Sequence, residues 1–285
     1  MNTKSNILPI CYRCDNKYKY FLINSVKSLL KHYKGEHKIH FYICTTETDF
    51  NLDELQCLQQ KYSFYYEIVK FDDDFIRQHS LQHCATILNK KILNFWNQSH
   101  WLHTNKYNHT TFPYNPFNRN KLICCCSIFF LATIHHEKVL CLDTDTIIVD
   151  DVSILFSTDV SNVIMAVSED WEIEKTINPS VVVTNTVKCR EIAFKKNGLI
   201  DTMLLYMKNP NNFAAPFADV IQEKMHQMVI DSHLVLDRAW NVPVTHLKRY
   251  DNVQPKIYHF CESWNGIPEV LNKYEEIVGI YLKNE

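Results

Sequence analysis

The sequence predicts an α/β protein built on a mixed, mostly parallel sheet that is flanked by helices. Strand and helix signals alternate through residues 7–71, and this alternation is typical of parallel strands joined by crossover helices. Further along, the apolar, β-branched run 138–149 has the composition of a buried strand and contains two acids, Asp143 and Asp145. These two observations indicate a sheet with a polar site at one of its edges.

The first part of the chain follows a βαβαβ order. Short apolar runs predict strands over 7–12 and 39–44, and apolar residues at helical spacing predict a helix over 18–33 between them. A helix over 52–62 and a strand over 64–71 complete the pattern. We expect these elements to form the parallel half of the sheet.

The segment 83–120 shows neither the apolar spacing of a helix nor that of a strand, and it is rich in Asn, His, Thr and aromatic residues. A stretch of this length is expected to be an insertion that serves as a lid or an acceptor-binding segment, because long loops in compact domains are usually functional. An insertion whose aromatic residues pack on their own domain is the alternative.

The rest of the chain continues the α/β pattern. The predicted helices cover 122–134, the segment from 150 to about 156, 191–207 and 217–239. The predicted strands are 163–167 and 181–184, followed by 242–247 and 256–260, which should close the sheet. No repeat or linker interrupts the sequence, and 285 residues can bury one core, so we expect a single domain over residues 1–285.

The composition excludes several classes of protein. A formal net charge of −2 disfavours a nucleic-acid-binding protein, which needs excess Lys and Arg. No apolar run is long enough to be a transmembrane segment. The N-terminal residues lack the pattern of a secretory signal, so the eleven cysteines are expected to be thiols in the cytoplasm, and peripheral contact with a membrane stays open.

The two acids after the apolar run are the candidate site. A buried carboxylate needs a metal ion or a strong hydrogen-bond network. We therefore expect the strand to break into a turn at Asp143 and Asp145, so that both reach one divalent cation, although acids at a strand end can also simply face water. His259, in the apolar run 257–260, is a candidate third ligand. A histidine on a strand can equally be a hydrogen-bonded core residue.

These features resemble glycosyltransferase family 8, the glycogenin-like and lipopolysaccharide galactosyltransferase-like enzymes with a Rossmann-like, A-type nucleotide-sugar fold. Residues 139–149 and 152–156 are similar to the D-x-D strand of the family and its following helix. Residues 14–18 before 25–30 resemble the opening nucleotide loop and first helix, and 178–185 resembles the strand with the family pattern N-A-G-V-L-L-I-N.

The resemblance implies a retaining hexosyltransferase that moves a hexose from a UDP-sugar donor to an acceptor hydroxyl. Asp143, Asp145 and His259 would hold Mn²⁺, or Mg²⁺, on the diphosphate. Asp15 would contact the base of UDP-hexose, Asn178 would face the sugar, and Asp231 would lie beside the anomeric carbon. The acceptor stays open among a glycan, a lipid-linked glycan and a protein side chain. Turn or capping roles for Asp15 and Asn178, and an exposed helical position for Asp231, are the alternatives.

The sequence also departs from the family pattern. Cys126 stands at the usual position of an arginine before D-x-D, with Lys121 and Arg119 a turn or two earlier, and Asn265 stands at that of a lysine that steadies the diphosphate. Glu262 and Ser180 replace glycines. The loss of these cations leaves open a catalytically weakened nucleotide-sugar-binding protein on the same scaffold.

A different class of enzyme also fits part of the sequence. Residues 140–146 match the nucleophile strand of haloacid-dehalogenase-like phosphatases, in which Asp143 would be the nucleophile and Asp145 the acid and base. No acidic pair follows on a later strand, and the strands before residue 120 would be unexplained.

Overall fold

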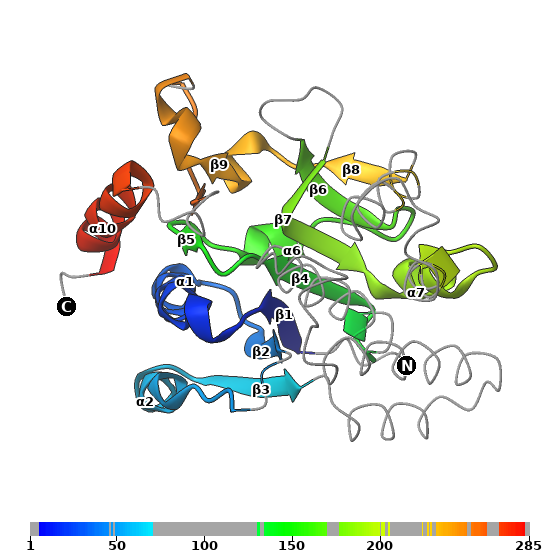
Figure 1. Ribbon diagram of the computed structural model, residues 1–285, viewed down its shortest axis with the longest axis horizontal. Helices are drawn as coiled ribbons and strands as arrows, with labels where there is room; N and C mark the ends of the chain where they lie inside the picture. Colours follow the sequence, from blue (N-terminus) through cyan, green and yellow to red (C-terminus); the bar gives the residue numbers. More distant parts are fainter. Residues whose placement is uncertain are drawn as a thin grey trace, which may run out of the picture.

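The computed structural model contains two β-sheets with helices packed around them (Figure 1). It describes residues 6–70 without 46 and 48, 130–169 without 132 and 133, 177–202 without 200, the single residues 205, 224, 227 and 229, and 232–282 without 250, 251 and 261–267. The predicted insertion 83–120, most of the predicted helix 122–134, and the candidate Asp231 lie outside the described residues.

The N-terminal half of the larger sheet is parallel, as the sequence predicts. It consists of β1 (Ile7–Arg13), β2 (Lys38–Thr45) and β3 (Phe64–Lys70), connected by α1 (Lys19–His32) and α2 (Asp53–Lys61). All five central residues of β1 are buried. Strands covered on both faces need such a continuous apolar run, which is the feature that identifies β1 in the sequence.

The other half of the larger sheet contains antiparallel pairings. β4 (Lys138–Leu142) lies parallel to β1, and β7 (Ile177–Asn185) runs antiparallel to β4 and to β6 (Met165–Glu169). β8 (His233–Val235) completes the order β3-β2-β1-β4-β7-β6-β8. The sheet is therefore mixed and mostly parallel, and the C-terminal ends of β1 and β4 lie at the same edge as the start of β7.

A second sheet corrects one prediction. Residues 242–247 and 256–260 were expected to close the main sheet, but β9 (Val242–Pro243) and β10 (Ile257–His259) pair with β5 (Thr146–Ile148) in a separate three-stranded sheet. The reason is the turn at Asp143 to Asp145, which ends β4 and redirects the chain away from the main sheet.

Helix α10 (Pro268–Leu282), which the sequence analysis did not predict, packs against the second sheet. Tyr274 of α10 meets the ring of Phe260 edge-on, with 4.7 Å between the ring centroids. Both side chains are almost fully buried. The helix therefore supports the residue that directly follows His259.

Two helix predictions are wrong in their bounds. The helix expected over 191–207 begins earlier, as α7 (Thr186–Phe194), because the side chain of Asn185 caps it by accepting from the Lys188 N–H. It breaks at residues 195–198, and the described residues 199, 201, 202 and 205 are helical again. Of the helix expected over 217–239, the described residues 224, 227 and 229 are helical, but 233–235 form β8 and 238–240 form a 3-10 turn, η3 (Arg238–Trp240). Backbone pairing with β6 overrides the apolar periodicity there. The short helix α6 (Ser153–Phe156) is where the sequence predicts it.

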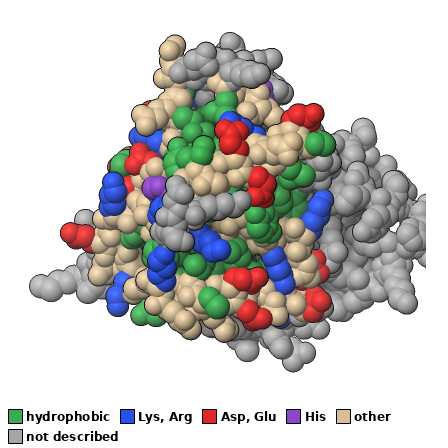
Figure 2. Space-filling view, turned by 90° about the vertical axis from the view of Figure 1, so that its left-hand side faces the viewer, with side chains coloured by type: hydrophobic (Ala, Val, Ile, Leu, Met, Phe, Trp, Pro, Cys, Tyr) green, Lys and Arg blue, Asp and Glu red, His purple; other side chains and the backbone are tan. Residues whose placement is uncertain are grey.

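The surface on the α10 side is mixed in charge. Figure 2 shows this side, where Lys and Arg side chains alternate with acidic ones and with apolar patches. Among its described residues, this face offers no continuous basic surface to a nucleic acid. Among the described helices, none combines the length and the apolar content needed to cross a bilayer.

Candidate metal centre

The D-x-D segment forms the turn between β4 and β5. The N–H of Asp143 donates to the carbonyl of Ser180 on β7 at 2.8 Å, and the hydroxyl of Thr146 donates to the carbonyl of Asp143 at 2.8 Å. These bonds fix the backbone on both sides of the turn. Because β4 lies between β1 and β7, the turn lies at the edge where three strands meet.

His259 comes to this turn through strand register. It lies opposite Thr146 in the antiparallel pair of β10 and β5, and the N–H of Phe260 donates to the carbonyl of Asp145 at 2.9 Å. Asp145 is 8% exposed and His259 5% exposed. The backbone therefore sets a buried carboxylate next to a buried imidazole.

The ligand atoms of Asp143, Asp145 and His259 all lie within 4.8 Å of one another. His259 Nε2 is 3.6 Å from Asp145 Oδ1, which is too long for a direct hydrogen bond. Neighbouring ligand atoms around an octahedral divalent ion with bonds of about 2.1 Å lie ~3 Å apart. Two carboxylates and an imidazole are a donor set suited to Mn²⁺. The residues present therefore fit a divalent cation.

Arg13 is a site residue that the sequence analysis missed. Its Nη2 donates to Oδ1 of Asp143, and the two side chains are 20% and 29% exposed. The pairing follows from topology, because β1 and β4 are parallel neighbours with Tyr12 beside Leu142, so the next residues along each strand also lie side by side. The sequence signal that could have identified Arg13 is its position at the end of the apolar strand β1, which a parallel sheet can place beside the D-x-D strand.

A chain of buried hydroxyls lies behind the turn. The Tyr12 hydroxyl lies 3.0 Å from Ser25 Oγ, and Ser25 Oγ lies 3.0 Å from Thr146 Oγ1, which donates to Asp143. Burial raises the pKa of Tyr12 well above its ordinary value, so its hydroxyl stays protonated. This neutral chain ties β1 and α1 to the backbone of the D-x-D turn.

Asp15 and Asn178 have local structural contacts. Asp15 caps a 3-10 turn, η1 (Asn16–Tyr18), by accepting from the N–H groups of Lys17 and Tyr18 at 3.0 and 3.1 Å. Asn178 accepts from the N–H of Ser180 at 3.1 Å. Asn178 thus holds Ser180, the residue whose carbonyl accepts from the N–H of Asp143. Asp15 lies two residues after Arg13, just past the end of β1. Their contacts with a donor remain predictions.

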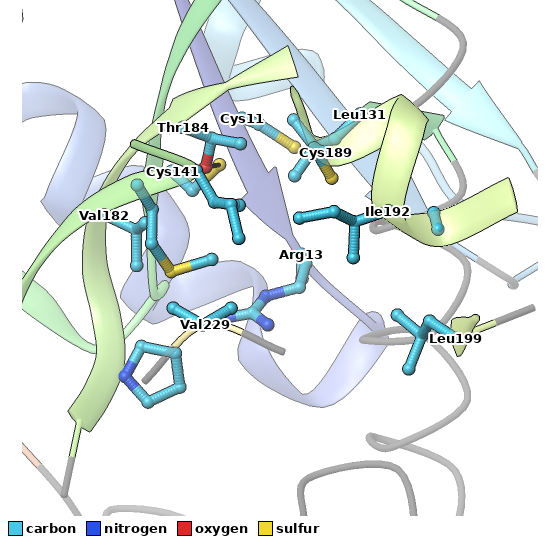
Figure 3. A pocket seen from close by; sticks show the side chains of 14 residues that line it. Cys11, Arg13, Leu131, Cys141, Val182, Thr184, Cys189, Ile192, Leu199 and Val229 are labelled. Carbon is cyan, nitrogen blue, oxygen red and sulfur yellow. Dashed lines mark hydrogen bonds between the residues drawn. The ribbon is translucent and has the colours of Figure 1, made fainter. Parts of the chain in front are cut away.

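A small cavity lies beside Arg13, between the main sheet and α7 (Figure 3). It has a volume of about 80 Å³. Its walls are mainly apolar and include Val182 and Ile192, together with the thiols of Cys11, Cys141 and Cys189. The Arg13 side chain points into it in Figure 3, so the aliphatic part of this residue is in contact with the core while its guanidinium reaches Asp143.

Known proteins match this chain in structure rather than in sequence. No protein-family model and no curated protein sequence matches the chain. Among solved structures, an active-site mutant of LgtC matches with a TM-score of 0.60 at 12% identity, over 96% of this chain and 96% of that one. The chain has the A-type glycosyltransferase fold.

Two further solved structures have the same fold. The glycosyltransferase GlyE of Streptococcus pneumoniae TIGR4 matches with a TM-score of 0.59 at 16% identity, over 94% of this chain and 60% of that one. Mouse xyloside xylosyltransferase 1 matches with a TM-score of 0.51 at 11% identity, over 89% and 97%. This chain thus spans about three fifths of GlyE. The predicted A-type fold is confirmed.

Proposed function

We propose that the protein is a metal-dependent glycosyltransferase that moves a hexose from a UDP-sugar to an acceptor hydroxyl with retention of configuration. The observation that carries the proposal is the group Asp143, Asp145 and His259 at the strand edge of an A-type glycosyltransferase fold. In open α/β sheets, ligands bind at such edges. Two solved structures that match this chain are named a glycosyltransferase and a galactosyltransferase.

In this proposal the three side chains hold the cation against the diphosphate of the donor. When bound, Mn²⁺ or Mg²⁺ would supply positive charge to the diphosphate as the glycosyl phosphate bond breaks. Asp143 and Asp145 provide oxygen ligands, and His259 provides a neutral nitrogen when its imidazole is unprotonated. The buried setting limits the access of water to the side chains of Asp145 and His259.

The remaining roles follow the resemblance. Asp15 would contact the base, Asn178 the hexose, and Asp231 the region of the anomeric carbon. The acceptor, whether a glycan, a lipid-linked glycan or a protein, is not specified by these contacts. A cytoplasmic location, with or without peripheral membrane contact, is part of the proposal and rests on the free thiols of the described cysteines.

The test is hydrolysis or transfer of UDP-hexose in the presence of Mn²⁺. We expect Asp145→Asn to lower the metal-dependent rate by at least ~100-fold, because the amide is a weaker ligand without charge. Asp159→Asn is the matched control, because Asp159 is exposed in the loop before β6. The proposal fails if Asp145→Asn keeps the wild-type rate.

The same assay separates the alternatives. Binding of UDP with Mn²⁺ but without turnover would support a weakened nucleotide-sugar-binding protein, which the replacements Cys126 and Asn265 favour. Release of phosphate from an aryl phosphate would support the phosphatase. The fold gives no support to the phosphatase, because it matches solved structures that are named as glycosyltransferases.

A further inference from the structure

We propose that Arg13 supplies positive charge that binds the donor diphosphate, at a site where Cys126 and Asn265 replace two basic residues of the family pattern. The inference rests on the proposed function and adds a residue to it. The family pattern has an arginine where this chain has Cys126 and a lysine where it has Asn265. Arg13 is the basic residue that the described part of the structure brings onto the candidate metal ligands.

The geometry supports this role. The Arg13 guanidinium donates to Oδ1 of Asp143, so it would be a neighbour of a cation held by Asp143 and could bond a diphosphate bound there. The side chain is 20% exposed, and its stem borders the cavity between the sheet and α7. A guanidinium is charged at every ordinary pH and bonds phosphate oxygens in a fixed planar geometry.

The charges of the site give the inference a distinctive consequence. Asp143 and Asp145 carry two negative charges, and Arg13 reduces the sum to one. The guanidinium therefore weakens the attraction of the empty site for a free divalent cation. Once the cation is bound, the same charge strengthens the attraction for an anionic diphosphate.

A purely structural role predicts something different. If Arg13 only oriented the carboxylate of Asp143, its loss would weaken the binding of Mn²⁺ alone and would weaken UDP at saturating Mn²⁺ by no larger a factor. If it binds the diphosphate, its loss leaves Mn²⁺ affinity equal or higher and weakens UDP. The affinity for UDP therefore falls by more than the affinity for Mn²⁺ only in the second case.

The test uses the full chain and titration calorimetry with MnCl₂ alone and with UDP at saturating MnCl₂. Arg13→Gln is the main variant, because it removes the charge and keeps a polar side chain with an amide donor. We expect Arg13→Gln to bind Mn²⁺ as tightly as the wild type or more tightly, and to bind UDP roughly ten-fold more weakly. Arg13→Lys should recover part of the UDP affinity.

Lys61→Met is the matched control for loss of one positive charge. Lys61 is exposed and ends α2 just before β3 begins, so it lies near the N-terminal edge of the parallel strands, opposite to the site. The UDP affinity of this variant should equal that of the wild type. Circular dichroism and urea unfolding establish that each variant is folded.

Three results would overturn the inference. Arg13→Gln could bind UDP as tightly as the wild type, or lose at least as much Mn²⁺ affinity as UDP affinity, and in both cases the proposed function would stand without this role for Arg13. If the wild type itself bound no UDP in the presence of Mn²⁺, the proposed function would fail, and the inference with it.

Discussion

At the scale of single residues, the candidate site depends on groups that are buried together. The pair Asp143 and Asp145 could be found from the sequence because acids at the end of an apolar strand are costly without a partner. Arg13 was missed because its meaning depends on β1 and β4 being neighbours, which a strand pattern alone does not specify. The capping contact of Asp15 is local, so it is one of the two roles that the sequence predicts for this residue.

Thr146→Val tests the hydroxyl chain behind the turn. Valine has nearly the same shape, but it removes the donor to the Asp143 carbonyl and the partner of Ser25 Oγ. We expect the free energy of unfolding to fall by about 1–3 kcal/mol, because buried polar atoms lose their partner. Urea unfolding measures this change.

A double-mutant cycle with Ser25→Ala is the control for this prediction. Ser25 and Thr146 share one hydrogen bond, so the two changes together should cost less than the sum of each alone. Additive effects would contradict the hydroxyl chain as a coupled network.

At the scale of elements, the strands of the parallel half were predictable and the later elements less so. Continuous apolar runs specify β1 and β2, which are covered on both faces. Nothing in the sequences of the short strands β5, β9 and β10 indicates which strands they pair with. Their assignment to a separate sheet therefore required the structure. β8 was mistaken for a helix because three residues at a sheet edge are too few to show a period of two.

The contact between Tyr42 of β2 and His136, which lies just before β4, predicts that the stability of the protein depends on pH. His40 stacks on Tyr42 of β2, whose hydroxyl lies 2.9 Å from His136 Nε2. Burial lowers the pKa of both histidines below the ordinary value of 6.5. The unfolded chain therefore takes up protons first as the pH falls, so stability is unaffected well above pH 6.5 and decreases as the pH falls below it.

His136→Gln measures the share of this effect that belongs to one residue. The amide can still bond the Tyr42 hydroxyl but does not titrate in this range. Between about pH 7.5 and 5.5 we expect the variant to lose less unfolding free energy than the wild type, by urea titration at each pH. An equal or larger loss in the variant would contradict the assignment.

At the scale of the whole molecule, the two sheets and α10 share one polypeptide without a linker among the described residues. If residues 1–285 form the single domain that the sequence predicts, we expect the two sheets to unfold together in one cooperative step. The buried core of the main sheet extends to Ile148 of β5 and Ile257 of β10, which belong to the second sheet. Shared burial of this kind couples the two sheets.

Thiol labelling tests this cooperativity. Cys11, Cys14 and Cys44 are buried in the main sheet or directly after β1, whereas Cys57 is exposed on α2. Burial, and then the nearby charge of Asp15, raises the pKa of Cys14, which slows its reaction further. In the native protein at neutral pH, we expect iodoacetamide to modify Cys57 at least ~100-fold faster than the three buried thiols, as measured by peptide mass spectrometry.

The three buried thiols should then become reactive together in urea, at the same concentration at which circular dichroism reports loss of structure. Modification of one of them at a clearly lower urea concentration would show that part of the sheet opens separately, and the single-domain prediction would be wrong.

The position of His259 beside Asp145, which the hydrogen bond from Phe260 to Asp145 fixes, has one more consequence. A cation chelated between Asp145 and His259 would cross-link two points that the chain reaches only after more than a hundred intervening residues, and closing a loop of that length removes much of the entropy of the unfolded chain. Chelators would then act on the protein as mild denaturants, loosening the attachment of the smaller sheet before they affect the strands of the larger one.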